Sequence, residues 1–363
     1  MFRGLLRTIE PAPKNEVNRP RLRKRVSERG YPKQSEVRLS VVIVNFCQWR
    51  NTAHLIRQLR HSEALLANRA EIVVIDNHSP HHPTISKLRR TDGVSLRRFS
   101  QNRGFAYAVN EGCSLGEGEW LLLLNPDMSV SRGFLDEVEQ LAKKMDEENP
   151  NVGVMGFRLV HPDGGAQASC GPFPTLMNTL GGLFLPRAER KCRILKTENR
   201  TIVPWVTGCC FLIRRDCLIS LGGFDEDFFL YYEDVDLCLR AARKGWDIFY
   251  EPKLKVTHHT PLHMRSVPAP LRLMTRHALL IFSKKHWPRW QTYLLSSIIW
   301  LEAFLKQIKN AISGQVEEAR FYHELRKLVL DVLHHRKEKA HQRIYQAALY
   351  LESTSTEQDG KCS

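Results

Sequence analysis

The apolar positions between residues 39 and 124 fall into four short runs separated by longer amphipathic stretches. Most of the runs are rich in Val, Ile and Leu without polar alternation, which is typical of strands buried on both faces of a parallel sheet. The stretches between them repeat apolar residues at three- and four-residue spacing, as helices do. The pattern therefore predicts an α/β fold with a mainly parallel sheet flanked by helices. The predicted strands are residues 39–44, 71–75, 94–99 and 120–124.

The alternation breaks down after a predicted helix at residues 134–145. A strand is expected at 152–157, but residues 159–204 have no clear period and are rich in Gly and Pro. A segment of that length in a compact domain is typical of a lid or binding loop. Residues 206–213 form a predicted strand, and the small residues at its start would let a ligand approach the backbone. Later strands are predicted at 248–250 and 254–256.

Beyond residue 261 the pattern becomes helical. The segment 290–312 carries large apolar side chains at helical spacing, which favours a face packed against the rest of the protein. A helix lying in a membrane surface is the alternative, because Trp287 and basic residues accompany the stripe. No segment reaches the roughly 18 apolar residues that a membrane-spanning helix needs. The stripe consists of Trp290, Tyr293, Leu294, Ile298, Leu301, Leu305, Ile308 and Ile312.

The formal charge of +15 is concentrated at the two ends of the chain. Residues 1–38 carry eleven Lys and Arg against four Asp and Glu, and residues 262–349 carry fifteen against six. The central part is close to neutral, so its ligand need not be nucleic acid, whereas the basic ends suit an anionic membrane surface. The predicted divisions are a basic flexible tail at 1–37, an α/β domain at 38–261, a helical region at 262–352 that suits a membrane surface, and a disordered tail at 353–363.

The nine cysteines have no C-x-x-C spacing, and most lie in apolar runs. Such cysteines are typical of the reduced core of an intracellular protein, rather than of a disulfide framework or a zinc site. The first residues lack the apolar segment of a signal peptide. We therefore expect a cytoplasmic protein, with peripheral attachment to the inner face of the plasma membrane as a further option.

Polar side chains stand where three of the predicted strands end: Asn45, Asp76 and Asp127. In open α/β sheets, ligands bind beyond the carboxyl ends of the strands. Each residue alone is explained as a turn that ends a strand, but three together favour a ligand site. The chain has neither the G-x-G-x-x-G context of a dinucleotide site nor a P-loop, so those two classes lose their main support.

A second acidic region, residues 224–240, mixes carboxylates with aromatic side chains. From Glu233 the spacing predicts a helix that ends near Gly245. Glu233 and Asp234 then lie in the first turn, where the helix dipole favours negative charge. They are either ordinary helix N-terminal acids or, at the floor of a cleft, a general base. The upstream acidic site favours the base.

The residue types suggest a metal-assisted group transfer. Asp127 and His258, each at a strand end, form a plausible partial shell for Mg²⁺ or Mn²⁺. A metal with so few protein ligands implies that the substrate supplies the rest, most naturally as a diphosphate. A separate carboxylate would take the proton of an incoming hydroxyl. Together these groups indicate transfer from a nucleotide-linked donor.

From about Leu39 to His259, ordered motifs resemble a family 2 glycosyltransferase of the GT-A fold, and most of all its bacterial rhamnosyltransferase-like branch. Asp76 lies in a stretch similar to V-x-D-N-x-S, and Asn125-Pro126-Asp127 is similar to the metal-binding D-x-D. Residues 233–240 resemble the E-D-x-D-L-x-x-R helix. The remaining matches are Val41–Asn45, Asn102–Ala106 with Asn110 and Gly112, Thr207-Gly208, Gly222–Glu226 and His258.

The resemblance implies a role for each matched residue. Asp234 would be the catalytic base beside Glu233, and Asp127 with His258 would bind the metal. Because Asn125 replaces the first D-x-D acid and His259 follows His258, metal affinity and the choice between these two histidines stay open. Donor-binding residues would be Asn45, Asp76 (to the nucleotide base), Asn77, Asn102, Gly104, Asn125 and Asp127. Acceptor-side residues would be Thr207, Gly208, Gly223, Phe224 and Asp225.

The function implied by the resemblance is an inverting transfer of a sugar in cell-surface polysaccharide synthesis. The donor would be a nucleoside-diphosphate sugar, with dTDP-rhamnose suggested by the branch, and the acceptor a saccharide or a polyprenyl-diphosphate-linked glycan. The alternatives are a silent nucleotide-sugar binder, which the intact Glu233-Asp234 pair opposes, and a nucleic-acid-binding protein. The charge lies outside the motif-bearing part, so nucleic acid is not expected as a partner.

Overall fold

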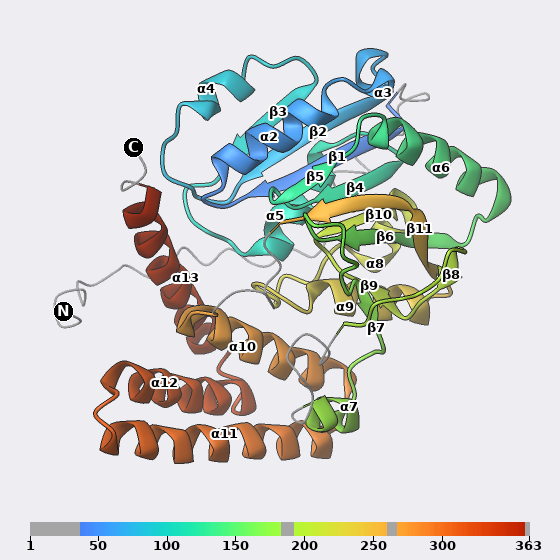
Figure 1. The fold of residues 1–363 in the computed structure, drawn as a ribbon. Helices are drawn as coiled ribbons and strands as arrows, with labels where there is room; N and C mark the ends of the chain where they lie inside the picture. The colour runs from blue at the N-terminus through green and yellow to red at the C-terminus, as the bar shows by residue number, and fades with distance from the viewer. Residues whose placement is uncertain (1–36, 183–191, 260–266, 360–363) are drawn as a thin grey trace.

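A computed structural model describes residues 37–182, 192–259 and 267–359 (Figure 1). The basic tail expected at the N-terminus lies almost entirely outside the described residues. The domain boundary expected at residue 261 also lies outside them. Among the described residues, no helix has both the length and the apolar character needed to cross a bilayer.

A nine-stranded mixed sheet forms the centre of the fold, in the order β3-β2-β1-β4-β10-β6-β11-β5, with β8 paired to β11. The first four strands are parallel, as predicted, and β10, β5 and β8 run antiparallel to their neighbours. The strands are β1 Leu39–Asn45, β2 Ala70–Asp76, β3 Val94–Arg98, β4 Trp120–Leu124, β5 Met128–Val130, β6 Val152–Val160, β8 Thr201–Ile202, β10 Cys210–Arg214 and β11 Asp247–His258. A separate two-stranded sheet pairs β7 Cys170–Gly171 with β9 Trp205–Val206.

Strand β1 shows why the apolar runs become central strands. All seven of its residues are buried, so both faces need cover and each neighbour must supply backbone hydrogen bonds. Its register with β2 pairs Asn45 with Asp76, which brings the two polar strand ends level with each other. The edge of the sheet that the sequence predicted for a ligand is therefore formed.

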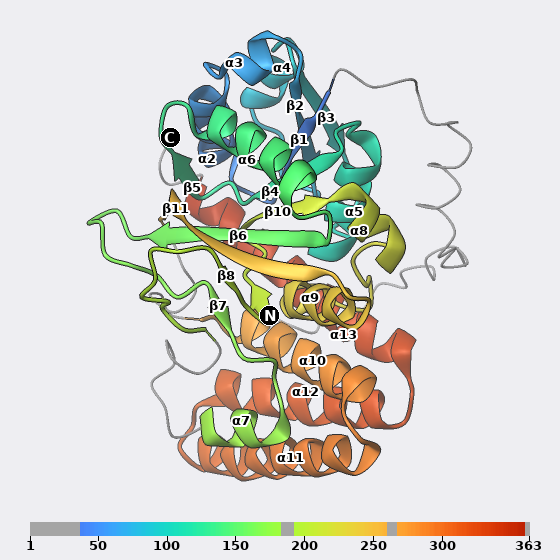
Figure 2. The same cartoon turned by 90° about the vertical axis from the view of Figure 1, so that its right-hand side faces the viewer.

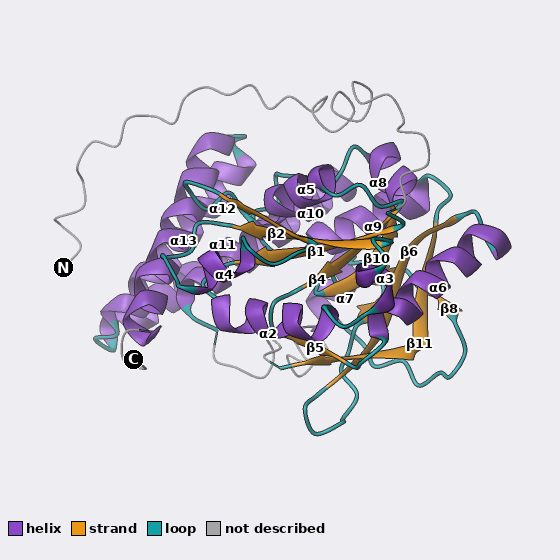
Figure 3. Cartoon of the chain, turned by 90° about the horizontal axis from the view of Figure 1, so that it is seen from above, coloured by secondary structure: helices purple, strands orange, loops and turns teal. Residues whose placement is uncertain are grey.

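Helices cover both faces of the sheet (Figure 3). The apolar stripes of one set join one buried cluster with β1, β2 and β4, and those of the other set join a second cluster on the opposite face. Gly112 lets α5 approach β1 closely, because a Cβ there would stand 2.4 Å from Val42 Cγ1. The first set is α2 Trp49–Leu59, α3 Glu63–Leu66, α4 Thr84–Leu88 and α6 Phe134–Glu148. The second set is α5 Phe105–Leu115, α8 Arg215–Leu221 and α9 Glu233–Arg243.

The C-terminal helices form a bundle next to α9 (Figures 1 and 2). Helix α10 links the two parts, because Ala278 and Phe282 join the sheet-side cluster while Leu273 and Leu280 join the bundle core. Short α7 Leu176–Gly181 contributes to the bundle core as well. The bundle consists of α10 Ala269–His286, α11 Arg289–Ile312, α12 Val316–Leu333 and α13 Lys337–Asp359.

Two expectations for the second half of the sheet need correction. The segment expected to be irregular over 159–204 contains the end of β6 and the elements β7, α7 and β8. The single strand expected at 206–213 is divided between β9 and β10, because Thr207–Cys209 form a turn that belongs to neither strand. The short strands were missed because two or three residues carry too little periodicity to be recognised.

Two expectations for the C-terminal region were also wrong. Helix α13 continues to Asp359, so the polar tail expected from Ser353 is helical over most of its length. The apolar stripe of α11 is not its packed face. Leu301 and Leu305 are 52% and 58% exposed, while the opposite face of the helix is buried in the bundle.

Candidate active site

The ends of β1 and β2 form one hydrogen-bonded unit. The Asn45 amide donates to Asp76 Oδ1 at 2.9 Å and to Ser79 Oγ at 3.0 Å. Thr52 Oγ1 in turn donates to Asn45 Oδ1 at 2.8 Å. Asn45 is fully buried, so its side chain braces the edge of the pocket from inside rather than facing a ligand.

Asp76 lies beneath the loop that follows β2. Its carboxylate accepts from Arg98 Nε at 2.7 Å and from the Ser79 amide at 3.2 Å, and the residue is fully buried. Burial of a carboxylate requires such compensation. The geometry supports a role in fixing the loop that follows β2. The direct contact with a base that the resemblance implied would require Arg98 to move.

Asn77 and Asn102 fasten the neighbouring loop. The side-chain amide of Asn77 donates to Asn102 Oδ1 at 2.8 Å, and Asn77 Oδ1 accepts from the backbone N–H of Arg103 at 2.9 Å. Gly104 follows with φ +82°, and a Cβ there would stand 2.7 Å from the Phe229 carbonyl oxygen. The same oxygen accepts from the Phe105 amide at 2.7 Å. The glycine thus allows the donor-side loop to contact the loop before α9.

Gly223 and Phe224 were expected on the acceptor side, but both are buried. Asn110 of α5 bonds the Phe224 backbone twice, with donor–acceptor distances of 2.8 and 2.9 Å. Gly223 has φ +86°, and a Cβ there would stand 2.8 Å from Asn110 Oδ1. The Phe224 ring stacks on Phe211 in the core. These two residues therefore anchor the loop, and their place on the acceptor side stays a prediction.

Asp127 and His258 meet at the end of β4 and β11, as the sequence predicted. Asp127 Oδ2 lies 3.4 Å from His258 Nε2, and both side chains are largely buried. Asn125, two residues earlier, is half-buried and bonds Cys209 through its backbone amide at 2.8 Å. His259 is exposed and contacts Ser129 Oγ instead, so His258 is the histidine next to Asp127.

Gln167, which sequence reasoning missed, fixes the orientation of His258. Its amide nitrogen faces the carbonyl oxygens of His258 at 2.8 Å and of Val160 at 3.2 Å, so that atom must be the donor. Gln167 Oε1 is then the acceptor facing His258 Nδ1 at 3.0 Å. His258 Nδ1 is therefore the donor to Gln167, and Nε2 is the ring nitrogen that faces Asp127.

This arrangement fits a divalent cation. Two ligand atoms bound to one Mg²⁺ or Mn²⁺ at about 2.1 Å stand about 3 Å apart, close to the separation of Asp127 Oδ2 and His258 Nε2. The residues that the structure describes hold no group of three or more His, Cys, Asp or Glu side chains suited to a metal. Further ligands would have to come from the substrate, as the sequence pattern suggested.

Asp234 begins α9 and is only 6% exposed. Its Oδ2 accepts from the Gly208 amide at 2.9 Å, and its Oδ1 accepts from the Val235 amide at 2.8 Å. Neighbouring Thr207 is held through its amide by the Ser169 carbonyl at 2.9 Å. The predicted acceptor-side backbone and the predicted base are therefore in contact.

Residues 231–233 lead directly into Asp234. Glu233 is 5% exposed. The residues before it, Tyr231 and Tyr232, have φ +72° and +65°, a region that non-glycine residues seldom adopt. Such backbone persists where surrounding structure enforces it, often at functional sites.

Cys209 connects the two halves of the site. Burial chiefly raises the pKa of the Cys209 thiol, and the charges of Asp127 and Asp234 raise that pKa further. The Gly208 amide bonds Asp234, and the carbonyl of the next residue, Cys209, accepts from the amide of Asn125, two residues before Asp127. The Asp127–His258 pair and the candidate base therefore adjoin the same turn.

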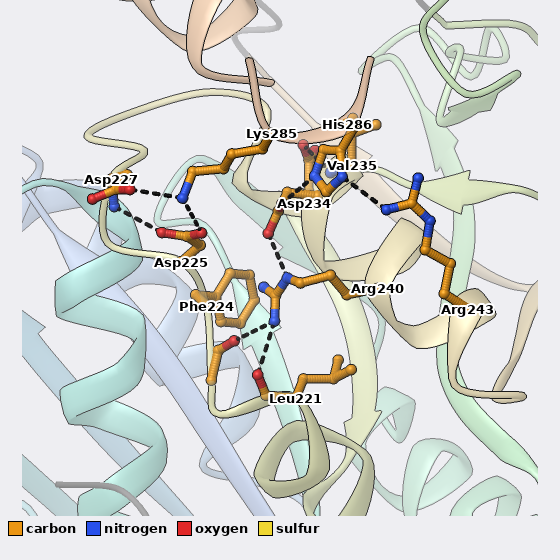
Figure 4. A network of polar contacts seen from close by, with 12 residues as sticks. Leu221, Phe224, Asp225, Asp227, Asp234, Val235, Arg240, Arg243, Lys285 and His286 are labelled. Atoms are coloured by element: carbon orange, nitrogen blue, oxygen red, sulfur yellow. Dashed lines mark hydrogen bonds and ion pairs between the residues drawn. The ribbon is translucent and has the colours of Figure 1, made fainter. Parts of the chain in front are cut away.

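A second group of residues that the sequence did not reveal comes from the end of α10 (Figure 4). Lys285 Nζ bonds Asp225 at 2.7 Å and Asp227 at 2.6 Å. His286 Nε2 lies 2.7 Å from Asp236 Oδ1, and Arg240 Nε donates to Asp236 Oδ2 at 2.7 Å. Asp225, expected on the acceptor side, is therefore engaged by the bundle.

The electrostatics of this group follow from its pairing. Burial alone would raise the pKa of Asp236, but His286 and Arg240 outweigh burial and lower it. Asp227 behaves in the same way, because Lys285 and Lys337 hold its pKa well below the usual range. The only sequence signal was a basic end to α10, which is ordinary for a helix C-terminus.

Comparisons with known proteins agree with this geometry. The family model described as "Glycosyltransferase like family 2" matches residues 38–278. A relative from Mycobacterium tuberculosis (strain H37Rv), named N-acetylglucosaminyl-diphospho-decaprenol L-rhamnosyltransferase, is 31% identical over 57% of this chain and 72% of its own length. Rhamnosyltransferase WbbL of Escherichia coli K12 is 25% identical over 46% of this chain and 63% of its own length.

The comparison with solved structures supports the fold. GalNAc-T7 with UDP, GalNAc and Mn²⁺ superimposes with a TM-score of 0.52 and 16% identity, covering 80% of this chain and 55% of that chain. At this identity the likeness concerns the fold alone, a sheet of the same kind flanked by helices.

Proposed function

Because the chain belongs to the glycosyltransferase-like family 2 and has the GT-A fold expected from its motifs, we propose that it transfers a sugar, with inversion, from a nucleoside-diphosphate sugar to an acceptor hydroxyl. The observation that carries this proposal is that Asp234 bonds the Gly208 amide, while the adjacent Cys209 carbonyl bonds the amide of Asn125, two residues before the Asp127–His258 pair. A diphosphate-binding position and a base then lie in one site.

For the donor, we propose dTDP-rhamnose. Support comes from the names of the relatives in Mycobacterium tuberculosis and Escherichia coli, both rhamnosyltransferases. The loops held by Asn45, Asp76, Asn77 and Asn102 would accommodate the nucleotide. Gly104 would let these loops stay close to the loop that leads to Asp234.

For the acceptor, we propose a saccharide or a polyprenyl-diphosphate-linked glycan in cell-surface polysaccharide synthesis. The decaprenol-linked substrate named for the mycobacterial relative supports the lipid-linked form. An acceptor of that kind would place the enzyme at the inner face of the plasma membrane, where its basic ends can meet anionic headgroups.

In the proposed mechanism, Asp127 Oδ2 and His258 Nε2 would hold the divalent cation. When bound, the cation supplies positive charge that stabilises the departing diphosphate. Asp234 accepts the proton of the acceptor hydroxyl as that oxygen forms a bond to the anomeric carbon and the bond to the diphosphate breaks. The Gly208 and Val235 amides orient the carboxylate, and the N-terminus of α9 stabilises its charge before transfer.

A donor panel tests this function. Binding and slow hydrolysis would be measured for dTDP-rhamnose and for UDP-, GDP- and dTDP-hexoses, each with Mn²⁺, Mg²⁺ or EDTA. We expect one donor to bind with metal and to bind at least about tenfold more weakly in EDTA. A folded sample that binds no donor under any condition would favour a silent or nucleic-acid-binding protein instead.

A further inference from the structure

Helix α11 presents a line of large apolar side chains to solvent. Leu301, Leu305 and Ile312 are 52%, 58% and 83% exposed. The opposite face is already in use, because Leu295 and Ile299 are buried in the bundle core. In the part of the chain that the structure describes, no element covers the exposed line. Leu294, Ile308 and Trp290 extend the exposed line along the helix.

The spacing of this line is that of a helix–helix seam. Its members, Leu294, Ile298, Leu301, Leu305, Ile308 and Ile312, are separated by four, three, four, three and four residues. That is the repeat of 3.5 residues that keeps one edge of a helix facing another helix. At 100° per residue the six positions cover about 80° of arc, and exposed Tyr293 lies about 60° beyond its edge.

We propose that this seam is the interface of a homodimer, in which α11 pairs antiparallel with α11 of a second copy. The seam is self-complementary about a two-fold axis at the level of Ala303. Antiparallel pairing then sets Leu301 opposite Leu305 of the second copy, and every seam residue opposite another apolar one. The further pairs are Leu294 with Ile312 and Ile298 with Ile308. A two-fold interface requires such matching of a surface to itself.

The charges beside the seam fit a second copy better than a lipid surface. Lys306, beside the seam on α11, is paired with Glu302 at 2.6 Å. Helices that lie in a membrane surface have a strongly basic polar face. In the antiparallel register, Lys306 and Lys309 fall opposite Trp300 and Ser297 of the second copy, so like charges do not meet. The proposal is independent of donor chemistry.

The oligomeric state of the full chain tests the proposal. Sedimentation velocity over about 1 to 100 μM should show a monomer–dimer equilibrium, since an interface of one helix pair is small. Leu301→Glu should raise the dissociation constant at least about 100-fold, because the symmetry places two unpaired charges in the seam. Leu66→Glu is the matched control, because Leu66 is 74% exposed on α3 and lies outside the seam.

Cross-linking tests the antiparallel register. A mixture of Leu301→Cys chains with Leu305→Cys chains should form disulfide-linked dimers that neither variant forms alone. A wild-type chain that stays monomeric throughout would overturn the proposal. If that monomer binds vesicles of phosphatidylglycerol and Leu301→Glu abolishes the binding, the seam is a lipid-binding face instead. Equal weakening by Leu66→Glu would also contradict the assignment.

Discussion

Gly104 shows how one position can join two parts of the site. Its φ of +82° favours glycine, and a Cβ would press on the Phe229 carbonyl, which is backbone and cannot swing aside. Phe229 belongs to the loop that enters α9, and α9 carries Asp234. The glycine therefore matters for the distance between donor loop and base, and not only for a local turn.

Replacing Gly104 by alanine should destabilise the protein and weaken donor binding. Gly133 is a control for positive φ alone, because it has φ +83° and open space where a Cβ would be built, but ψ −5° where Gly104 has ψ 165°. Gly133→Ala should cost only the backbone strain, about 1 kcal/mol. Gly104→Ala should cost at least about twice as much and raise the donor dissociation constant, as measured by urea unfolding and calorimetry. Equal costs for the two variants would argue against the contact.

At the residue scale, the sequence indicated which residues lie near the site better than it indicated their roles. Asp127 and His258 lie 3.4 Å apart, as their places at strand ends suggested, whereas the role of Asp234 as the base stays a prediction. Asn45, Gly223 and Phe224 turned out to be buried supports. Gln167 and His286 could not be predicted, since each acts through a partner more than forty residues away along the chain.

At the scale of elements, the end of α10 sets the position of α9. Lys285 bonds Asp225 and Asp227 in the loop before α9 (Figure 4). The next residue, His286, bonds Asp236 within α9. Paired carboxylates of this kind fix geometry more reliably than they add stability. The end of α10 therefore braces both the loop before α9 and the helix itself.

Removing the Lys285 charge should therefore slow the reaction more than it weakens binding. Lys285→Met leaves Asp225 and Asp227 without their shared partner, so the loop before Glu233 should loosen. We expect turnover to fall about 10- to 100-fold, the loss typical of small misplacements, with donor affinity nearly unchanged. Lys284→Met is the control, because Lys284 bonds only the Val332 carbonyl among the partners seen here. Similar losses in both variants would contradict the positioning role.

His277 makes the bundle sensitive to acid. Burial, followed by the nearby His341, lowers the pKa of His277 to about 3 from its ordinary 6.5, although Asp227 acts in the opposite direction. Below pH 6.5 the unfolded chain binds a proton that the folded chain does not, so the free energy of unfolding falls as pH drops toward 3. For this residue the loss between pH 7 and pH 5 should be about 2 kcal/mol.

Chemical unfolding at the two pH values measures this effect. His277→Leu should reduce the loss between pH 7 and pH 5 by about 2 kcal/mol, whatever it does to the stability at pH 7. A remaining part is expected from His341, because burial chiefly lowers the pKa of that histidine as well. His54→Leu, at an exposed histidine of α2, should leave the dependence as in the wild type. An unchanged slope in His277→Leu would mean that another buried group carries the acid response.

Periodicity predicted the long elements and failed on the short ones. The strands β1, β2 and β4 are buried runs whose pattern allows little else. The two-residue strands β7, β8 and β9 depend on what lies beside them, so no local pattern specifies them. The stripe of α11 was recognised but assigned to the wrong side, since periodicity shows that a face exists without showing which neighbour covers it.

At the scale of the whole molecule, helix α10 joins the sheet that carries the candidate site to the C-terminal bundle. The family match ends at residue 278, inside α10, and Ala278 and Phe282 still pack against the sheet-side core. The excess of basic residues in the bundle is partly balanced locally, as in the Arg272–Glu318 pair at 2.6 Å. The acid of that pair is already counted among the six acids of residues 262–349, so the bundle keeps its net positive charge.

The measurement that tests the account most directly is sugar transfer by Asp234→Asn. Asparagine keeps the size of the side chain but cannot accept the acceptor proton as a carboxylate does. We predict that turnover falls about 10²- to 10⁴-fold while the donor dissociation constant stays within about threefold of the wild type. Asp92→Asn, at an exposed acid far along the chain, should behave as the wild type. Turnover that survives in Asp234→Asn would show that this carboxylate is not the base.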